Sequence, residues 1–373
     1  MRIICILPDW KPTYSNKNVG KLFLNYEKKK LNFALYCSKN SDITDFNNRF
    51  KFGTIYTNRP ELNKKSFSTW IISFISFIKV LFVFRPNYVL WTYVGYKETF
   101  FLSILRLFNG PKYVIKMDSM KIHNKNFYQK LRNLILINFP FYFSSKILCE
   151  TEEIYKLLYS YGSKRMLFPN GVPKSLLDLY NSKYNQIKSS ISSPYFLYTG
   201  RIMHLKGLHL LVEAFEKIHK KIPEWKVVIV GEVIEPTYWK KIQKRLNTKK
   251  IKDKFVFIDF SEGFEYYKWH YFAKIFVMPS LDEGLPNRMV ESMFFKLPII
   301  SYDVGQVHEY VDNETGFLIS EVGNSDILSK SMLDLAENPN LLDTFSLNAY
   351  DIAKKLDDEV LFDKLFKSTL LRF

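Results

Sequence analysis

Two glutamates, Glu283 and Glu291, stand eight positions apart in a segment that joins a strand-like run to a helix-like run. The apolar run 275–278 leads into the segment, and the helical pattern continues to about residue 296. Such a junction lies at the carboxyl end of a parallel sheet, the edge where open α/β folds bind ligands. Gly284 lets the backbone approach a ligand closely, and the helix N-terminus offers unpaired N–H groups. The pattern therefore predicts a ligand site.

The spacing of the two glutamates is ambiguous on its own. On one continuous helix, with about 3.6 residues per turn, eight positions turn the second side chain about 80° from the first. Acidic residues near a helix start are also favoured by the helix dipole without any ligand. The role of the pair therefore depends on what the rest of the chain supplies.

Two cations follow another strand-like run, 195–199, in the sequence YFLYTGRIMHLKG. Gly200 and Arg201 come directly after the run, and Lys206 precedes the next helical pattern. Arginine presents a planar fork that matches two phosphate oxygens, and lysine adds a compact charge. At a sheet edge these residues form a diphosphate clamp; elsewhere they are two solvated cations in a chain with 54 of them. Gly231 follows the run VVIV in the same way, which a structural turn also explains.

Length and composition favour a two-domain α/β protein. The 373 residues are 47% apolar, and about 150 residues per domain is the usual prior. Short β-like runs alternate with helical patterns, which predicts two doubly wound Rossmann-like domains. The predicted strands are 3–7, 33–37, 88–91, 113–116, 147–149 and 166–168 in the first half and 195–199, 225–230, 255–258, 275–278, 299–301 and 317–319 in the second. We place the first at 1–180 and the second at 195–350, joined by the serine-rich segment 181–194, with a last helix at 351–373 packing back toward the first domain. The chain lacks a GxGxxG or Walker motif, which argues against dehydrogenase and P-loop functions.

Charge and cysteine content narrow the possible partners. The formal charge of +17 attracts phosphates in nucleic acid, anionic lipid or nucleotides, without choosing among them. The three cysteines show neither pairing nor metal-ligand spacing, which is typical of a reduced, cytoplasmic protein. No cleavable signal peptide is visible. The apolar segment 67–84 contains Lys79 and several Ser and Thr residues, so we expect a buried or partly membrane-facing helix rather than a span.

Several of these segments, in this order and spacing, resemble the retaining glycosyltransferases of family 4, which have the GT-B fold. The matching stretches are TGRIMHLKGLHLLVEAF, VIVGE, PSLDEGLPNRMVESM and SYDVGQVHEYVDNETGFLI, with FPNGVP before them. The resemblance is strong over 195–320 and weaker before. It implies two Rossmann-like domains facing across a cleft, an N-terminal one for the acceptor and a C-terminal one for a nucleotide-sugar.

The resemblance also implies roles for individual residues. Arg201 and Lys206 match the pair that binds the donor diphosphate and stabilises the leaving group. Glu291 matches a glutamate that accepts hydrogen bonds from the ribose, and Glu283 one that lies near the transferred sugar. The implied catalytic residues are Glu283, Arg201, Lys206 and Asp118; the implied donor-binding residues are Gly200, Arg201, Lys206, Gly231, Glu283, Gly284, Leu285, Asn287 and Glu291.

The first half departs from the family pattern. The segment PDWKPTYSNKNVG lacks the usual glycine-rich loop, and the run Lys116-Met117-Asp118 lacks the histidine that many members carry before the aspartate. The acceptor side is therefore poorly specified, and the role of Asp118 stays a hypothesis.

The function implied is transfer of a sugar, with retained anomeric configuration and without metal or other cofactor. The expected acceptor is a lipid-linked glycan of a bacterial surface polysaccharide such as a capsule or O-antigen. We expect the enzyme on the inner face of the cytoplasmic membrane, held peripherally by anionic lipid. Another GT-B enzyme, such as a nucleotide-sugar epimerase, is the nearest alternative. A nucleic-acid-binding protein would share the positive charge but leave the two glutamates unexplained, because carboxylates repel phosphates.

Overall fold

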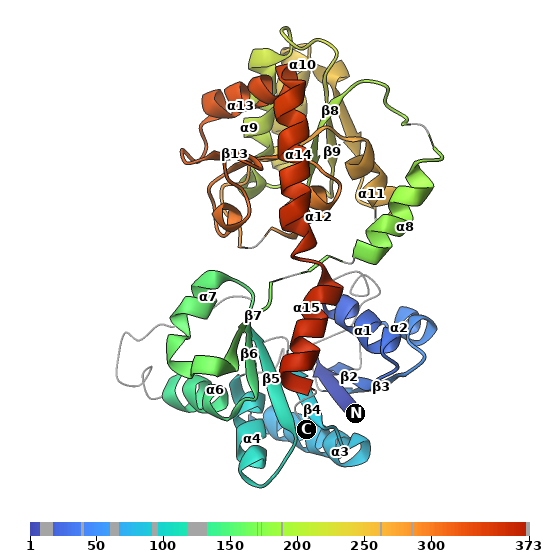
Figure 1. Cartoon of the computed structure of the whole chain (residues 1–373), viewed down its shortest axis with the longest axis vertical. Coiled ribbons are helices and arrows are strands. Elements are labelled where there is room, and N and C mark those ends of the chain that lie inside the picture. The colour runs from blue at the N-terminus through green and yellow to red at the C-terminus, as the bar shows by residue number, and fades with distance from the viewer. Residues whose placement is uncertain are drawn as a thin grey trace. The chain divides into compact units, whose positions relative to one another are not determined.

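The structure is a computed structural model that describes residues 1–7, 18–38, 41–59, 67–91, 96–117, 133–169, 171–172, 174–187, 189–261, 263–284 and 286–370. The chain divides into two units (Figure 1). The first consists of Met1–Gly171 and Asp358–Phe373, and the second is Val172–Asp357. The chain therefore passes from one unit to the other twice, and the serine-rich segment 181–194 lies inside the second unit.

The described part of the first unit contains a parallel sheet with the strand order β3-β2-β1-β4-β5-β6-β7. Its strands are β1 Arg2–Ile6, β2 Asn32–Ser38, β3 Gly53–Arg59, β4 Tyr88–Trp91, β5 Lys112–Met117, β6 Lys146–Cys149 and β7 Arg165–Leu167. Its α-helices are α1 Asn18–Lys28, α2 Thr44–Arg49, α3 Phe67–Phe84, α4 Tyr96–Leu107, α6 Phe139–Phe143, α7 Glu152–Leu157 and α15 Asp358–Leu365.

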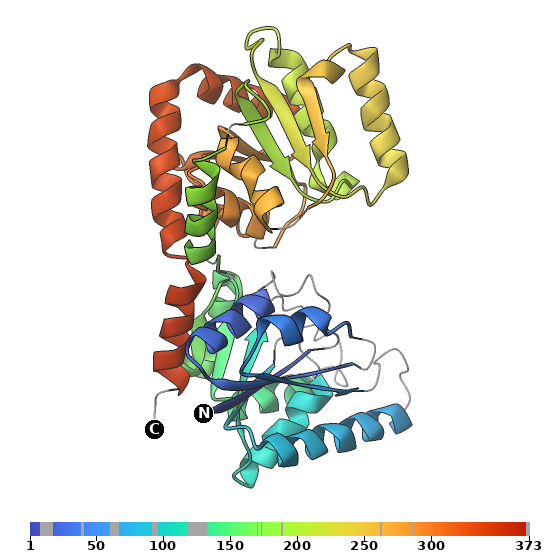
Figure 2. The same ribbon diagram turned by 90° about the vertical axis from the view of Figure 1, so that its right-hand side faces the viewer.

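Helices cover both faces of this sheet because successive strand residues point to opposite sides. Ile3 and Cys5 of β1 pack into a core that α1, α2 and α15 complete. Ile4 and Ile6 point the other way, into a core completed by α3, α4 and α6. Figure 2 shows α3 on the far side of the sheet from α1. Buried on both faces, the central strands are nearly continuous apolar runs, whereas the edge strand β3 is only partly covered.

The second unit is built around a parallel sheet with the order β10-β9-β8-β11-β12-β13. Its strands are β8 Tyr195–Thr199, β9 Lys226–Val230, β10 Phe255–Ile258, β11 Ile275–Met278, β12 Ile299–Tyr302 and β13 Gly316–Ile319. Its α-helices are α8 Lys174–Tyr184, α9 Leu208–Ile218, α10 Pro236–Thr248, α11 Gly263–Phe272, α12 Asn287–Phe294, α13 Ser325–Glu337 and α14 Pro339–Lys354. The predicted pair of doubly wound, Rossmann-like sheets is confirmed.

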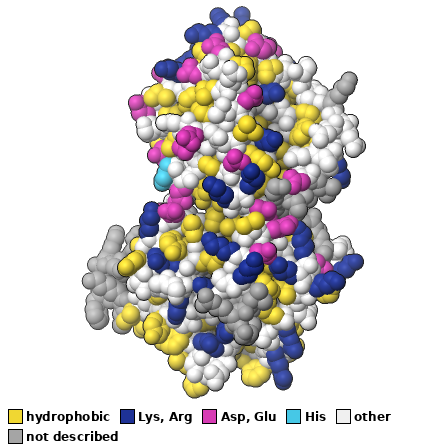
Figure 3. All heavy atoms as spheres, in the orientation of Figure 1, with side chains coloured by type: hydrophobic (Ala, Val, Ile, Leu, Met, Phe, Trp, Pro, Cys, Tyr) yellow, Lys and Arg dark blue, Asp and Glu magenta, His cyan; other side chains and the backbone are white. Residues whose placement is uncertain are grey.

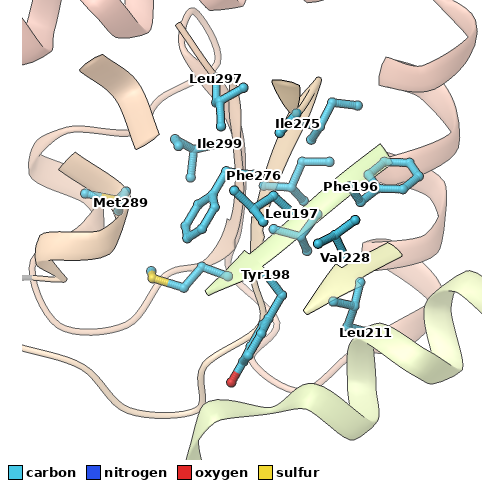
Figure 4. Packing of buried hydrophobic residues seen from close by; sticks show 14 of the residues in the cluster. Phe196, Leu197, Tyr198, Leu211, Val228, Ile275, Phe276, Met289, Leu297 and Ile299 are labelled. Atoms are coloured by element: carbon cyan, nitrogen blue, oxygen red, sulfur yellow. The ribbon is translucent and has the colours of Figure 1, made fainter. Parts of the chain in front are cut away.

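The core of the second unit holds the central strands rigidly in place. Phe196 of β8, Leu211 of α9, Phe276 of β11 and Met289 of α12 all belong to one buried cluster (Figure 4). Every residue of β8 and of β11 is buried. The loops that leave these strands at their carboxyl ends therefore start from fixed positions.

The strand order shows where successive strands stop being added on one side of β8 and begin to be added on the other. From β8 the chain adds β9 and β10 on one side, and then β11, β12 and β13 on the other. The two strands at this switch point are β8 and β11, and ligands of open α/β sheets bind just beyond the carboxyl ends of such a pair. In the first unit the corresponding pair is β1 and β4, whose following loops lie outside the described residues.

Candidate functional site

The loops after β8 and β11 are tied to each other at the switch point of the second sheet. Leu281 N donates a hydrogen bond to Leu205 O at 2.9 Å. Gly207, at the end of the first loop, has a φ of +66°, and a Cβ on it would lie 1.8 Å from Pro279 O. Only glycine fits this close approach of two backbones. The residues that follow β8 and β11 are thereby brought together.

Lys206 and Glu283 form an ion pair in the space between these loops. Lys206 Nζ lies 2.6 Å from Glu283 Oε1, and Ser280 Oγ donates to the same oxygen at 2.8 Å. The two side chains are only 18% and 16% exposed. A pair so shielded from water interacts more strongly than a surface pair. The structure therefore places a lysine and a carboxylate from segments far apart in sequence in one small site.

The other residues after β8 and β9 are held by their backbones. Tyr198 OH donates to Arg201 O at 3.1 Å, whereas the Arg201 side chain is exposed and pairs with no other described residue. Gly200 N donates to Val230 O at 3.0 Å. A Cβ on Gly231 would lie 1.9 Å from Gly200 O, so the two glycines end neighbouring strands in backbone contact. The Arg201 side chain remains available for a ligand on this edge.

Glu291 lies in α12 rather than in the loop, and its side chain is nearly enclosed. The helix starts at Asn287, directly after Pro286. Glu291 is 7% exposed and accepts a hydrogen bond from Arg288 Nη1 at 3.0 Å. Asn287 is exposed, and a Cβ on Gly284 would meet no atom within 4 Å. Leu285 and Asp118 lie outside the described residues.

Aromatic side chains of α11 pack beside Glu291 and Arg288. The Arg288 Cζ lies 4.5 Å from the centroid of the Tyr266 ring, which itself lies 4.7 Å from the His270 ring. Tyr266 OH donates to Thr199 Oγ1 at 3.1 Å. Burial, assisted by the charge of Arg288 and opposed by that of Glu291, lowers the pKa of His270 to about 3. This histidine is therefore neutral at physiological pH.

The sequence interpretation missed Arg288, Tyr266 and Ser280. Arg288 and Glu291 stand three positions apart, the spacing at which helical side chains meet. The helix predicted there could therefore have indicated their ion pair. Tyr266 comes from another helix, and its approach to Arg288 follows only from the packing of α11 against the sheet. Ser280 stands three residues before Glu283, in a loop where spacing predicts no contact.

The carboxyl edge of the first sheet carries a buried ion pair. Lys116 Nζ of β5 lies 3.4 Å from Glu150 Oε2, which directly follows β6, and the side chains are 6% and 9% exposed. Lys116 is thus a structural partner of Glu150. In the sequence it precedes Asp118, which lies outside the described residues, by two positions. Among the residues that the structure describes, no cluster of three or more His, Cys, Asp or Glu side chains is suited to a metal ion.

A solved structure that also consists of two Rossmann-like units defines the class of the fold. HepE from Anabaena, in complex with UDP, superposes with a TM-score of 0.77 at 16% identity, covering 100% of both chains. At this identity the similarity shows the fold alone. The chain therefore has the GT-B fold that the sequence motifs implied.

The sequence comparisons relate the second unit to known glycosyltransferases. Residues 183–352 match the model of glycosyl transferases group 1, a range that lies within the second unit and contains all of its strands. An uncharacterized glycosyltransferase of Haemophilus influenzae is 30% identical over 146 residues, 39% of this chain and 40% of the relative. The capsular polysaccharide biosynthesis glycosyltransferase CapM of Staphylococcus aureus is 24% identical over 205 residues, 52% of this chain and 51% of CapM. The chain thus spans about half the length of these relatives, and its second unit matches the model of glycosyl transferases group 1.

Proposed function

We propose that this protein is a retaining glycosyltransferase that takes a sugar from a nucleotide-sugar and places it on a glycan acceptor. The observation that carries the proposal is the Lys206–Glu283 pair at the switch point of the second sheet, with the exposed Arg201 on the same loop as Lys206. A diphosphate needs cations, and a sugar needs a carboxylate close to its hydroxyls and anomeric carbon. Both are present at the edge where such sheets bind ligands.

The chemistry assigned to these residues follows from where charge develops. The bond between the anomeric carbon and the diphosphate oxygen breaks, and its electron pair leaves with the diphosphate. The acceptor oxygen attacks from the same face, and its proton passes to the departing phosphate oxygen. Arg201 and Lys206 stabilise the growing negative charge, and Glu283 stabilises the oxocarbenium-like sugar. Charges already in place contribute without reorganisation, and two protein cations supply what a metal ion would, so we propose a metal-independent reaction.

Names among the relatives and neighbours support the proposed substrates. CapM belongs to capsular polysaccharide biosynthesis by its name, and another relative, from Rhizobium meliloti, is a lipopolysaccharide core biosynthesis mannosyltransferase, 28% identical over 37% of this chain. HepE has been solved with UDP-glucose. We therefore propose a nucleotide-sugar donor and a lipid-linked glycan acceptor in the cytoplasm. A GT-B epimerase is the alternative, and it would release the altered sugar without an acceptor.

The direct test is thermal stability of the full chain with UDP, GDP, ADP and CMP, followed by transfer assays with the matching nucleotide-sugars. A ligand that binds only the native state at a hundred times its Kd stabilises it by about 2.7 kcal/mol. We expect one nucleoside diphosphate to raise Tm, and the sugar transfer to persist in EDTA with the α-anomer retained from an α-linked donor. Absence of a shift with every nucleotide would refute the proposed function.

A peripheral attachment to anionic lipid is supported by the outer face of α3. Ile75, Lys79, Phe82 and Val83 recur at helical spacing along this face, and Phe82 and Val83 are 75% and 70% exposed. Exposed apolar side chains in a row along one helix face are typical of a surface that contacts a partner or a membrane. No helix in the described part of the chain is both long and apolar enough to span a membrane. An interfacial position, with the helix lying along the lipid surface, fits both observations.

The charge around α3 favours an anionic surface over a protein partner. Residues 67–117 contain a single carboxylate, Glu98. Besides Lys116, which is buried and paired with Glu150, the cations of the same stretch are Lys79, Arg85, Lys97, Arg106 and Lys112. On the face shown in Figure 3, basic and hydrophobic side chains share the surface of the first unit. Each basic residue close to an anionic leaflet contributes about 1 kcal/mol.

Replacing Phe82 and Val83 by Glu is expected to lower binding to phosphatidylglycerol-containing vesicles at least tenfold, because two apolar anchors become like-charged with the lipid. Flotation of vesicles with the full chain measures the bound fraction. Leu347→Glu changes a residue of similar exposure, 57%, in the second unit, and serves as the matched control. Unchanged binding of the double variant, or loss of binding in the control, would contradict the assignment of this surface.

A further inference from the structure

Arg288 connects Glu291 to the end of β8 through an aromatic ring. Its Nη1 donates to Glu291 Oε2 at 3.0 Å, and its Cζ lies 4.5 Å from the centroid of the Tyr266 ring. Tyr266 OH donates in turn to Thr199 Oγ1 at 3.1 Å, and Thr199 is the last residue of β8. These contacts join α12, α11 and β8 across the switch point of the sheet.

Glu291 and Arg288 differ in their exposure to water. Glu291 is 7% exposed and Arg288 is 39% exposed. A carboxylate with so little water around it stays ionised only beside a cation or several hydrogen-bond donors. His270 does not supply the charge, because it is neutral, and Lys206 is paired with Glu283. Arg288 is the cation that the structure places on Glu291.

The ring of Tyr266 restricts where the guanidinium can lie. Cations are attracted to the face of an aromatic ring within about 6 Å of its centroid, and a second ring, that of Phe260, has its centroid 5.9 Å from Arg288 Cζ. The side chain of Tyr266 is itself fixed by burial and by its bond to Thr199. The guanidinium therefore meets Glu291 from one direction, and together with a hydrogen bond from the neutral Tyr267 of α11 it fixes how the carboxylate is turned.

We propose that Arg288 is a positioning residue for the nucleotide. It keeps Glu291 ionised and oriented, so that the carboxylate accepts hydrogen bonds from the ribose hydroxyls, and it acts on the nucleotide through Glu291 rather than by touching it. The inference rests on the proposed function, and within it on the assignment of Glu291 to the ribose. Through Tyr266 and Thr199, Arg288 also connects the ribose side of the site to β8, the strand that Gly200 and Arg201 follow.

A double-mutant cycle separates action through Glu291 from direct contact with the nucleotide. The Kd of whichever of UDP, GDP, ADP and CMP binds the wild-type chain is measured by calorimetry for Arg288→Gln, Glu291→Gln and the double variant. Residues that act through one interaction give non-additive effects. We expect each single change to weaken binding about tenfold, and the double variant to bind no more weakly than Glu291→Gln. A hundredfold loss in the double variant, the product of the two single effects, would overturn the proposal.

The pH dependence of binding gives a second readout that a merely structural role would not move. Without Arg288 the enclosed carboxylate has a raised pKa, so the Kd of Arg288→Gln relative to wild type should increase as the pH falls from 8 to 6. Arg288→Lys keeps a positive charge and should keep the ratio flat, as should Glu291→Gln. A flat ratio for Arg288→Gln would overturn the proposal.

Arg245 offers a matched control for these measurements. It is 36% exposed and pairs at 2.9 Å with Glu216, a contact between α10 and α9 outside the loops that follow β8 and β11, so Arg245→Gln should leave nucleotide binding unchanged. The Tm of each variant shows whether it is folded. If the wild-type chain binds none of UDP, GDP, ADP and CMP, the proposed function falls and takes this inference with it. If wild type binds and the single effects multiply, only the role of Arg288 is refuted.

Discussion

Lys206→Ala is expected to lower kcat about a hundredfold to a thousandfold, the usual cost of removing one preorganised group that stabilises charge in a transition state. The structure holds Lys206 Nζ within 2.6 Å of Glu283, in a site where both side chains are largely shielded from water. The ammonium is thereby fixed at the switch point before any substrate arrives. Steady-state kinetics with the nucleotide-sugar identified by the binding panel measures the loss.

Glu291→Gln is expected to change KM for the donor, in contrast to Lys206→Ala, which changes kcat. A neutral amide in place of the carboxylate weakens hydrogen bonds to the ribose, which are made equally in the ground state and in the transition state. We therefore expect about a tenfold higher KM for the donor with little change in kcat, since bonds to a charged group contribute about 1.5–3 kcal/mol. Equal and small effects of the two substitutions would argue against both assigned roles.

Lys217→Ala is the matched control for Lys206→Ala. Lys217 also pairs with a carboxylate, with its Nζ 2.8 Å from Asp326 Oδ1, but it lies on α9 and is 34% exposed. Its removal should leave kcat and KM unchanged, because an ion pair this open to water contributes little. A comparable loss of turnover in this variant would show that ion pairing in general, rather than the site, sets the activity.

The strands of the second unit were predictable because they are short apolar runs, and burial of β8, β9, β11 and β12 accounts for that composition. The runs at 195–199, 225–230, 255–258, 275–278, 299–301 and 317–319 each coincide with a strand to within one or two residues. In the first unit the pattern missed β3, whose sequence is GTIYTNR. This strand is at the edge of its sheet, where a strand is only partly covered and tolerates polar residues.

The site was predictable only in part, for a geometric reason. Strand-then-glycine patterns indicated which segments lie at the ligand edge, but not which two of them are neighbours. Lys206 and Glu283 meet because β8 pairs with β11, and strand order is a property of the whole sheet that local spacing does not encode. Arg288 was within reach of helical spacing, whereas the contact of Tyr266 with it depends on packing between elements.

Gly207→Ala is expected to lower the Tm by about 6 °C or more, through two separate effects on the loop that carries Lys206. An alanine at a φ of +66° costs about 1–2 kcal/mol as a left-handed residue. The added methyl group would also overlap Pro279 O, and forcing the two backbones apart costs about 1–3 kcal/mol more. About 3 kcal/mol in a unit of this size corresponds to the shift given, at roughly 2–4 °C per kcal/mol.

Gly323→Ala isolates the first of these effects. Gly323 has a φ of +88°, and a Cβ on it would meet only Leu281 Cδ2 at 3.9 Å, an ordinary contact. Its Tm should therefore fall by about half as much, because only the left-handed backbone is penalised. Overlap with Pro279 O also separates the loops after β8 and β11, so Gly207→Ala should weaken nucleotide binding while Gly323→Ala leaves it intact. Differential scanning fluorimetry with and without the nucleotide measures both effects. Equal Tm losses in the two variants would contradict the prediction, because the backbone contact between the loops would then not be what holds Lys206 against Glu283.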